Sequence, residues 1–379
     1  MTMIISKKKV IEHFWAIFFS GMILLSVFGG VFSREVLDNS SIGYYINYFL
    51  WISLGVVYVI KERKNPFSKE YVIISGLILL NTIVGMIYGK VILDLRADNL
   101  HQGVIIGLVI VMVMGVNWND YLCKEDLLLL MRVVFIIGII ASLYAMIIQN
   151  QNWIGVLIGK ERMNNAWEYR SFFGQRNVFA YFCFLSVSAG MYLLYITHKK
   201  RYLFGMLLLT LQIYVTDSRT AMLMFLLFLT MCIYLNLGRK GKIVLPLLGV
   251  CLILLIIVFT DLSVLIGRFY HETNTSFGDS GSLRFNMWYS GVQYLFSNGA
   301  VLSGFGFDSQ GPYLEPLFKL KSFHNAFMDI IFQGGIIFLG IHLYTIGKVI
   351  KSVSKIENKG YKYIWISFIA AFLFGCLFD

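Results

Sequence analysis

The chain has 379 residues, 58% of them hydrophobic and 14% charged, and its formal net charge is +11. A soluble domain carries about 25% charged residues, so this composition excludes a globular protein that folds in water. Apolar segments of about 18 residues or more recur along the chain, the length that crosses a hydrocarbon core about 30 Å thick. The composition therefore predicts an all-α polytopic membrane protein. A positive charge of this size often indicates nucleic acid, but in a membrane protein it reports first on topology, and we expect no nucleic-acid partner.

About eleven membrane spans are expected, and they form one integral membrane domain over residues 1–379. The first span follows Lys7, Lys8 and Lys9 and has no small-residue cleavage site. We therefore expect it to be retained rather than removed as a signal peptide. The predicted spans are 10–33, 43–60, 71–88, 103–118, 127–148, 178–197, 202–216, 220–237, 243–265, 324–347 and 363–378.

The orientation follows from the basic residues, which collect on the cytoplasmic loops of membrane proteins. With the N-terminus in the cytoplasm, 19 of the 32 basic residues fall on the inner side. Two long loops then lie on the outer face, at 149–177 and 266–323. Loops of this length are usually functional or disordered, and the aromatic residues in these two argue against disorder. Residues 283–296 have apolar side chains at helical spacing, which predicts a helix along the membrane interface.

The five cysteines predict neither disulfides nor a metal site. By this topology four of them lie in spans, and Cys123 lies in a cytoplasmic loop. No cysteine falls in an outer loop, where disulfides would form, and no metal-ligand spacing is present. We therefore expect no bound metal.

The inner and outer sides carry different cations. On the inner side 16 of the 19 basic residues are Lys, whereas eight of the twelve outer ones are Arg. A guanidinium group binds phosphate through two parallel hydrogen bonds, so the outer arginines favour an anionic ligand. The alternative is that they pair with lipid headgroups or with outer carboxylates such as Glu161, Glu168 and Asp279. The outer arginines are Arg34, Arg96, Arg162, Arg170, Arg176, Arg219, Arg268 and Arg284.

Arg219 is the most distinctive of these arginines because it lies in the turn between two predicted spans. The preceding span has about 15 residues, or about 22 Å of helix, which is shorter than the hydrocarbon core. The turn is therefore expected to be recessed, where a charge is costly without a partner or a function. The alternative to a ligand is an ion pair with nearby Asp217.

His324 begins a predicted span directly after the second outer loop. An imidazole at the outer mouth of a helix exchanges protons near neutral pH, which fits a general base. The alternative is an ordinary interfacial histidine. Two glycine motifs favour the functional interpretation: Gly304-Phe305-Gly306 lies upstream, and Gly334-Gly335 lies inside the span, where small residues permit close helix approach.

Several motifs occur together in a recognisable order. They are Gly174-Gln175-Arg176-Asn177-Val178-Phe179-Ala180, Ser218-Arg219-Thr220-Ala221, Arg284-Phe285-Asn286-Met287-Trp288, Gly304-Phe305-Gly306, His324-Asn325 and Gly334-Gly335. In this order and with these loop lengths they resemble the O-antigen ligase and polysaccharide polymerase superfamily. The resemblance covers roughly 170–340, and the first 150 residues match only in being hydrophobic spans.

The resemblance implies a membrane-embedded glycosyltransferase fold in the bacterial plasma (inner) membrane. Such an enzyme joins an undecaprenyl-diphosphate-linked glycan to an acceptor sugar hydroxyl on the outer face, without metal, cofactor or nucleotide sugar. By carry-over, the diphosphate would be bound by Arg176, Arg219 and Arg284. The acceptor hydroxyl would be activated by His324. Supporting roles would fall to Ser218, Asn325, Trp288, Gly304 and Gly306.

Within that superfamily the preferred interpretation is a capsular or exopolysaccharide polymerase, and the alternative is a ligase that moves glycan onto lipid A core or protein. A flippase for lipid-linked oligosaccharides is the alternative from another class, but it should line a mid-span cavity with charges, whereas the ionisable residues here collect at outer ends and loops. The expected partners are the lipid-linked donor, a glycan acceptor and membrane lipid, with a flippase and a chain-length regulator as candidates. Members of the superfamily usually continue into a further helix where this chain reaches Asp379, which predicts a shortened variant.

Overall fold

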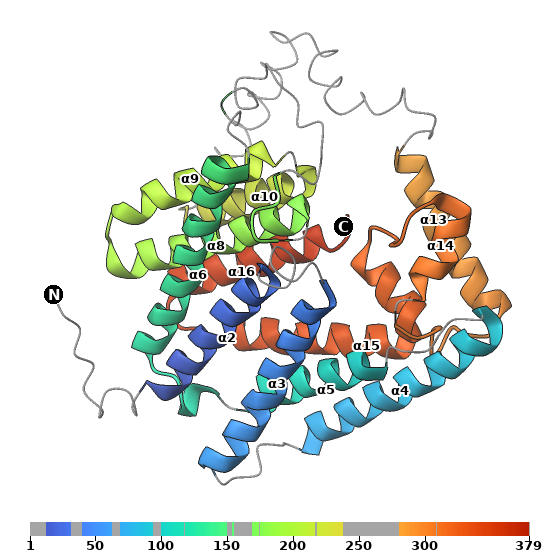
Figure 1. Cartoon of the computed structure of the whole chain (residues 1–379). Helices are drawn as coiled ribbons and strands as arrows, with labels where there is room; N and C mark the ends of the chain where they lie inside the picture. Colours follow the sequence, from blue (N-terminus) through green and yellow to red (C-terminus); the bar gives the residue numbers. More distant parts are fainter. Residues whose placement is uncertain are drawn as a thin grey trace. The chain divides into compact units, whose positions relative to one another are not determined.

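The structure is a computed structural model in which all regular structure of the described residues is helical (Figure 1). This confirms the predicted all-α class. The described residues are 13–31, 40–62, 69–93, 100–116, 118–149, 154, 169–173, 175–216, 218–237, 280–307 and 309–378.

Each predicted span overlaps a helix, except 243–265, which lies outside the described residues. The helices are α2 (Phe14–Val31), α3 (Ser40–Glu62), α4 (Lys69–Leu93), α5 (Leu100–Met114), α6 (Lys124–Tyr144, continued by a π-helical turn, Ala145–Gln149), α8 (Arg176–Thr197), α9 (Arg201–Val215), α10 (Arg219–Asn236), α13 (Ser280–Ser297), α14 (Gln310–Phe318), α15 (Ala326–Ser354) and α16 (Lys359–Gly375). A short 3-10 turn, Trp118–Asp120, precedes α6. The helix predicted for 283–296 is confirmed by α13.

By length and composition, five helices in the described part of the chain could cross a membrane. They lie at Lys69–Val91, Lys124–Gln149, Arg176–Thr197, Arg219–Asn236 and Ala326–Ser354. Shorter apolar helices lie at Phe14–Phe28, Val104–Met114 and Arg201–Val215. The chain is therefore a multi-pass membrane protein by its helices, while the number of about eleven spans and the two outer loops stay predictions. The short span predicted before Arg219 corresponds to α9, which has 15 residues.

The chain forms two compact units, which we call the first and second units. The first comprises residues 1–77 and 104–225, and the second comprises residues 78–103 and 226–379. Two long helices contribute to both units, since α4 begins in the first and ends in the second, and α10 does the same.

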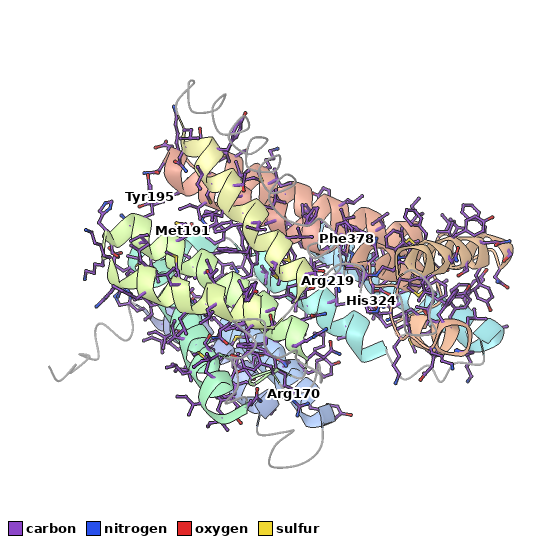
Figure 2. The ribbon with its side chains drawn as sticks, turned by 90° about the horizontal axis from the view of Figure 1, so that it is seen from above. Arg170, Met191, Tyr195, Arg219, His324 and Phe378 are labelled. Carbon is purple, nitrogen blue, oxygen red and sulfur yellow. The ribbon has the colours of Figure 1, made fainter. Side chains whose placement is uncertain are left out.

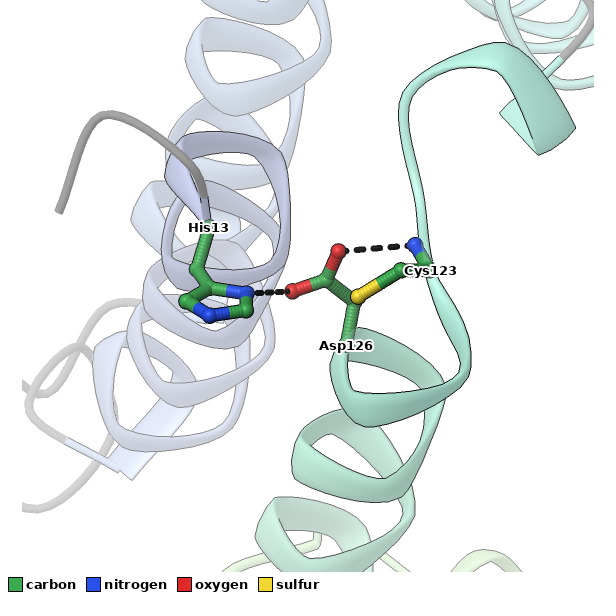
Figure 3. Close-up of side chains that lie close together, drawn as sticks. All are labelled: His13, Cys123 and Asp126. Carbon is green, nitrogen blue, oxygen red and sulfur yellow. Dashed lines mark hydrogen bonds and ion pairs between the residues drawn. The ribbon is translucent and has the colours of Figure 1, made fainter. Parts of the chain in front are cut away.

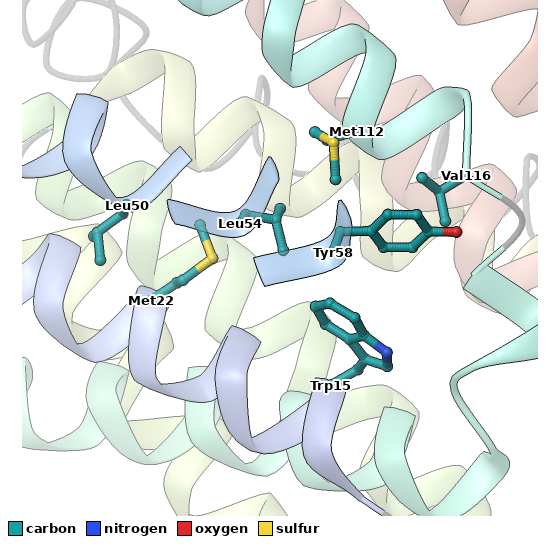
Figure 4. Packing of buried hydrophobic residues seen from close by; sticks show 7 residues of the cluster. All are labelled: Trp15, Met22, Leu50, Leu54, Tyr58, Met112 and Val116. Carbon is teal, nitrogen blue, oxygen red and sulfur yellow. The ribbon is translucent and has the colours of Figure 1, made fainter. Parts of the chain in front are cut away.

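In the first unit, α2 packs on α3 and α6, α6 on α8, and α8 on α9. Close approach of α6 and α8 depends on small residues. A Cβ added at Gly138 would lie 2.4 Å from Ser186 Oγ, and one added at Gly190 would lie 2.6 Å from the Phe135 ring. Such small-residue contacts are typical of helices that pack in lipid. A separate core joins α2, α3 and α5 around the buried side chains of Trp15, Met22, Leu50, Leu54, Tyr58, Met112 and Val116 (Figure 4).

In the second unit, α13 and α14 pack beside the N-terminal half of α15 (Figure 1). Their shared core is aromatic and fully buried at Phe305, Phe323 and Phe332, with the rings of Phe323 and Phe332 5.1 Å apart. Tyr294 of α13 and Tyr313 of α14 stack against the same core. The segment from α13 to α15 is therefore one packed body rather than a loose loop.

Helix α15 is broken at Gly335, whose backbone has φ 65° and ψ −167°. The break would leave backbone polar groups without their helical partners, but the turn at 301–306 pairs with them. Phe305 N–H donates to Phe332 O at 3.0 Å, and Gly306 N–H donates to Gln333 O at 2.8 Å. On the other side of the break, Val301 O accepts from the backbone N–H of Ile336 at 2.9 Å.

A side chain from α4 completes this pairing. The buried Asn81 amide donates to Gly334 O at 2.8 Å and to Ser303 O at 3.4 Å. The carbonyls of residues 332–334 thus regain the partners that the break removes, as backbone groups away from water require. Gly85, one turn further along α4, lies so near the turn that a Cβ there would be 2.8 Å from Gly306 N.

Glycine is required where the turn meets the broken helix. Gly304 and Gly306 have φ of 64° and 93°, and a Cβ on Gly304 would lie 2.5 Å from the carbonyl of Gln333. From the sequence, Gly334-Gly335 is predicted to permit the approach of another helix. That expectation is wrong in its partner, because the segment that approaches Gly335 is the backbone of the turn, with Leu302 O 2.2 Å from a Cβ built there.

Replacing Gly335 by Ala should destabilise the protein strongly. The conformation of Gly335 is essentially open only to glycine, at a cost of about 1–3 kcal/mol for other residues, and the clash with Leu302 adds to that cost. Thermal unfolding of the detergent-solubilised protein measures the effect. The control is Gly340→Ala in the same helix, where a Cβ meets nothing within 4 Å and should be neutral or stabilise by about 0.5–1 kcal/mol. Equal stability of the two variants would contradict this account of the break.

Candidate functional site

His324 lies in a turn just before α15, not at the first residue of that helix as the sequence predicted. Its φ is 50°, in the left-handed region that non-glycine residues adopt uncommonly. The helix begins after Asn325, whose side-chain Oδ1 accepts from the backbone N–H groups of Phe327 at 3.0 Å and Met328 at 3.1 Å. Asn325 is therefore the N-cap residue of α15, and the cap fixes where the helix starts relative to the imidazole.

The turn that carries His324 is held by Asp329, in the first turn of α15. Asp329 Oδ1 accepts from Phe323 N–H at 3.1 Å, and Asp329 Oδ2 accepts from the Ser322 hydroxyl at 3.3 Å. Ser322 Oγ in turn accepts from the backbone N–H of His324 at 3.0 Å. The carboxylate therefore organises the backbone on both sides of Phe323, and a negative charge in the first turn of a helix is itself favourable. Asp329 and Ser322 are not predictable from the sequence, because polar residues at a helix start are common.

Trp288 on α13 contacts the same turn. Its indole N–H donates to Phe323 O at 2.8 Å, which joins α13 to the residue before His324. Arg284 lies four residues earlier on α13, so both side chains project from one face of that helix. The Arg284 guanidinium donates through Nη1 to Phe378 O at 3.4 Å.

The residues that follow α16 contact both Arg284 and the start of α15. Ala326 N–H donates to Cys376 O at 2.8 Å, two residues before the carbonyl that Arg284 contacts. The structure thus gathers the candidate base, the indole of Trp288 and one candidate phosphate ligand around the beginning of α15.

The other two candidate phosphate ligands lie in the first unit. Arg176 is the first residue of α8 and Arg219 is the first residue of α10. The first turns of helices present open backbone N–H groups and the positive end of the helix dipole, which favour anions. Ser218 precedes Arg219 and is buried, and its carbonyl accepts from Met222 N–H at 3.0 Å, the first bond of α10. Asp217, the alternative partner of Arg219, lies outside the described residues.

Both arginines lie at the same end of the first unit. Helices α8 and α9 form an antiparallel hairpin through the short turn at 198–200, so the start of α8 lies beside the end of α9, where α10 begins. Tyr195 marks the opposite end of α8, away from Arg219 and Arg170 (Figure 2).

A short segment before α8, residues 169–173, is anchored at this same end. The buried Tyr169 hydroxyl donates to Gln212 Oε1 on α9, and burial raises the pKa of Tyr169, so the phenol stays protonated. Ser171 exchanges two hydrogen bonds with the Gln149 side chain, at 2.6 and 3.0 Å. Arg170 lies between these two anchors, which fix its backbone. Tyr169 and Gln212 were missed from the sequence because a lone Gln in an apolar span and a Tyr in a loop give no pattern.

The glycines of the turn and the second histidine of α15 have partners that indicate structural roles. Gly304 and Gly306 form the turn that supports α15 and have structural rather than chemical roles. His342, further along α15, is half-buried, and its Nδ1 is 2.9 Å from Phe338 O of the same helix. This contact gives the imidazole a hydrogen-bond partner within α15. Three further residues of the predicted outer loops, His271, Trp153 and Trp167, lie outside the described residues.

In the part of the chain that the structure describes, one group of side chains could hold a metal ion. His13, Cys123 and Asp126 have ligand atoms within 4.8 Å of one another (Figure 3). This group shows no metal-ligand spacing in the sequence. Cys123 and Asp126 are neighbours at the start of α6, but His13 precedes them by 110 positions or more.

Comparison with known families gives one match. Residues 204–343 match the family described as O-Antigen ligase. This segment contains Arg219, Arg284 and His324, whereas Arg176 lies outside it. No curated protein and no solved structure gave a significant match. The match supports the resemblance predicted from the sequence, because residues 204–343 are similar to the O-antigen ligase family.

Proposed function

We propose that the protein is a membrane glycosyltransferase that moves a glycan from a lipid diphosphate to an acceptor sugar hydroxyl on the outer face of the bacterial plasma membrane. The family match supports an enzyme of the ligase and polymerase type. The observation that carries the proposal is the turn before α15. There a histidine is held in a left-handed conformation by Asn325, Asp329 and Trp288. A residue held against its backbone preference is a functional candidate.

The chemistry needs a base and a cation. The acceptor oxygen attacks the anomeric carbon, and the bond from that carbon to the diphosphate oxygen breaks. The bonding electrons leave with the diphosphate. His324 takes the acceptor proton, since a sugar hydroxyl is a weak nucleophile until a base assists it. The charge on the diphosphate is stabilised by Arg219, Arg284 and Arg176, whose planar guanidinium groups match its oxygens. In this proposal no metal or other cofactor takes part in the transfer.

The more specific form of the proposal is a polymerase that adds repeat units of a capsular polysaccharide or exopolysaccharide. The donor would be an undecaprenyl-diphosphate-linked oligosaccharide and the acceptor a second such glycan. The family description makes an O-antigen ligase the second candidate. A flippase for the same lipid-linked donor is the third.

Reconstitution in vesicles with an undecaprenyl-diphosphate-linked oligosaccharide tests these three functions. A ladder of lengthened glycans on lipid indicates a polymerase. Appearance of one glycan on an added lipid A core or protein acceptor indicates a ligase. Transfer of intact donor across the bilayer without a new glycosidic bond would refute the glycosyltransferase proposal.

Replacing Arg219 or Arg284 by Lys should abolish most transfer activity while the protein still inserts in the membrane. Lys keeps the charge but loses the bidentate geometry, and a lost charge-assisted contact costs about 1.5–3 kcal/mol, or roughly tenfold to a hundredfold in rate. The measurement is the initial rate on the lipid-linked donor. The matched control is Arg201→Lys, at the opposite end of α9, which should retain wild-type activity. Full activity in both Arg219→Lys and Arg284→Lys would return these residues to a structural role.

Replacing His324 by Ala should lower the transfer rate by about 10²–10⁴-fold, the usual contribution of general-base catalysis. Donor binding should persist, because it depends on the arginines. His324→Gln separates two roles, since an amide hydrogen-bonds the acceptor but does not accept its proton. Wild-type activity of His324→Gln would show that the residue only positions the acceptor. The control is His342→Gln, which should leave the rate nearly unchanged because that imidazole bonds its own helix.

Replacing Asp329 by Ala should release the turn that holds His324. Two hydrogen bonds to a carboxylate are lost, at about 1.5–3 kcal/mol each. We expect faster hydrogen exchange at Phe323 and His324, with kcat lowered more than donor affinity. Asp329→Asn keeps an acceptor and should recover part of the rate. The control is Glu315→Ala on α14, an exposed carboxylate 3.9 Å from Lys321, which should change little. Slow exchange in Asp329→Ala together with a lost rate would contradict a positioning role.

A further inference from the structure

We propose that His13, Cys123 and Asp126 bind a transition-metal ion of the zinc class in the first unit, on the side of the membrane predicted to face the cytoplasm. The three side chains offer one nitrogen, one sulfur and one oxygen, all within 4.8 Å of one another (Figure 3). Imidazole, thiolate and carboxylate are the ligands of zinc sites, whereas magnesium and calcium prefer oxygen alone. The chemistry of the donor set therefore selects the metal.

Two of the ligands are fixed to one another at the start of α6. Cys123 is the N-cap residue with an extended backbone, and its N–H donates to Asp126 Oδ2 at 2.8 Å. Asp126 is 1% exposed, and its other oxygen, Oδ1, lies 2.6 Å from His13 Nδ1. The Asp126 carboxylate is therefore held from two sides, by the backbone of Cys123 and by the imidazole of His13.

The third ligand, His13, is held by a rigid aromatic cluster. Trp15, two residues later on α2, packs at 5.6 Å from the ring of Tyr58 and at 5.5 Å from that of Trp118. Tyr121, two residues before Cys123, packs against the same rings, and its hydroxyl accepts from Tyr58 at 3.0 Å. The segments on both sides of the cluster are therefore packed together before any metal arrives, so little conformational entropy is lost on binding.

The site has a path for entry. Cys123 is exposed and the His13 side chain is 34% exposed, while Asp126 is buried beneath them. With three protein ligands, the fourth position of a tetrahedral zinc ion is left for water.

An ordinary ion pair between His13 and Asp126 is the competing explanation, and it accounts for the contact at 2.6 Å. The capping box of α6 gives the Cys123 side chain a further role, since it accepts from the backbone N–H of Asp126. The observation that favours a metal is that nitrogen, sulfur and oxygen ligand atoms from two separate segments lie within 4.8 Å of one another. A bound ion would cross-link α2 to α6 through residues 110 positions apart and stabilise the first unit by mass action. All three residues lie outside the matched segment, so this inference is independent of the proposed function.

The test uses the full chain, expressed without a histidine tag and purified in detergent. We expect about one zinc per chain by mass spectrometry of the metal. Cys123→Ser and His13→Ala should lower zinc affinity by roughly tenfold or more. Replacing zinc by Co²⁺ should give visible tetrahedral bands and a thiolate-to-cobalt charge-transfer band, and the latter should vanish in Cys123→Ser. The matched control is Cys376→Ser, a second cysteine that is not fully buried, which should keep both metal and spectrum.

Three outcomes would overturn the metal site. The first is a wild-type protein with no more zinc than Cys123→Ser. The second is a cobalt complex without a thiolate band. The third is a wild-type protein whose stability added zinc does not change although His13→Ala is less stable, which would indicate an ion pair and no metal. Transfer of glycan by Cys123→Ser in the presence of EDTA separates this inference from the proposed function, since the proposed transfer uses no metal.

Discussion

The pairing between the turn at 301–306 and the break in α15 is the constraint on which the second unit depends. A helix interrupted inside a membrane must recover the hydrogen bonds that it loses, because lipid offers none. Here the backbone of the turn and the amide of Asn81 supply them. The turn follows α13 directly, so the position of α13 beside α15 is set by backbone bonds as well as by the aromatic core. Trp288 on α13 then reaches the residue before His324. The arrangement of the candidate base thus depends on the break eleven residues further along the chain.

Helix beginnings organise the charged groups in both units. Arg176 and Arg219 are first residues of helices, and His324 lies two residues before another. At the starts of α8 and α10 the helix dipole favours anions, whereas at α15 the Asn325 side chain already accepts from the backbone N–H groups of Phe327 and Met328. The proposed binding of a diphosphate without metal would gain from this arrangement, because guanidinium groups and helix ends would neutralise its charge together. The short helix α9 contributes by placing the start of α10 at the end of a 15-residue helix rather than a full span.

The sequence predicts the helices well, because apolar runs of span length leave few alternatives to a helix in lipid. The helix at 283–296 follows from the spacing of its apolar residues, and α13 confirms it. The candidate site is predictable only where a motif names a residue, as at His324 and Arg284. It is not predictable where a contact joins distant segments. Asn81 bonds Gly334 across 253 positions, and His13 meets Asp126 across 113. Single polar residues in apolar spans carry no period that would indicate such partners.

Local geometry distinguishes the two histidines at the start of α15 and within it, and it makes one of them the better candidate for a functional residue. His342 lies within regular helix, and its Nδ1 bonds the carbonyl of Phe338 one turn away. This ring nitrogen therefore has a partner in its own helix. His324 occupies a left-handed backbone conformation, which costs roughly 1 kcal/mol or more outside glycine. The strained conformation is kept because hydrogen bonds from neighbouring groups hold the turn. They come from the Asn325 cap, from Asp329 in α15 and from Trp288 on α13. If the imidazole had no function, a glycine or asparagine at this position would satisfy the same backbone with less strain. The conformation of His324 is therefore the physical reason to regard it, and not His342, as the base.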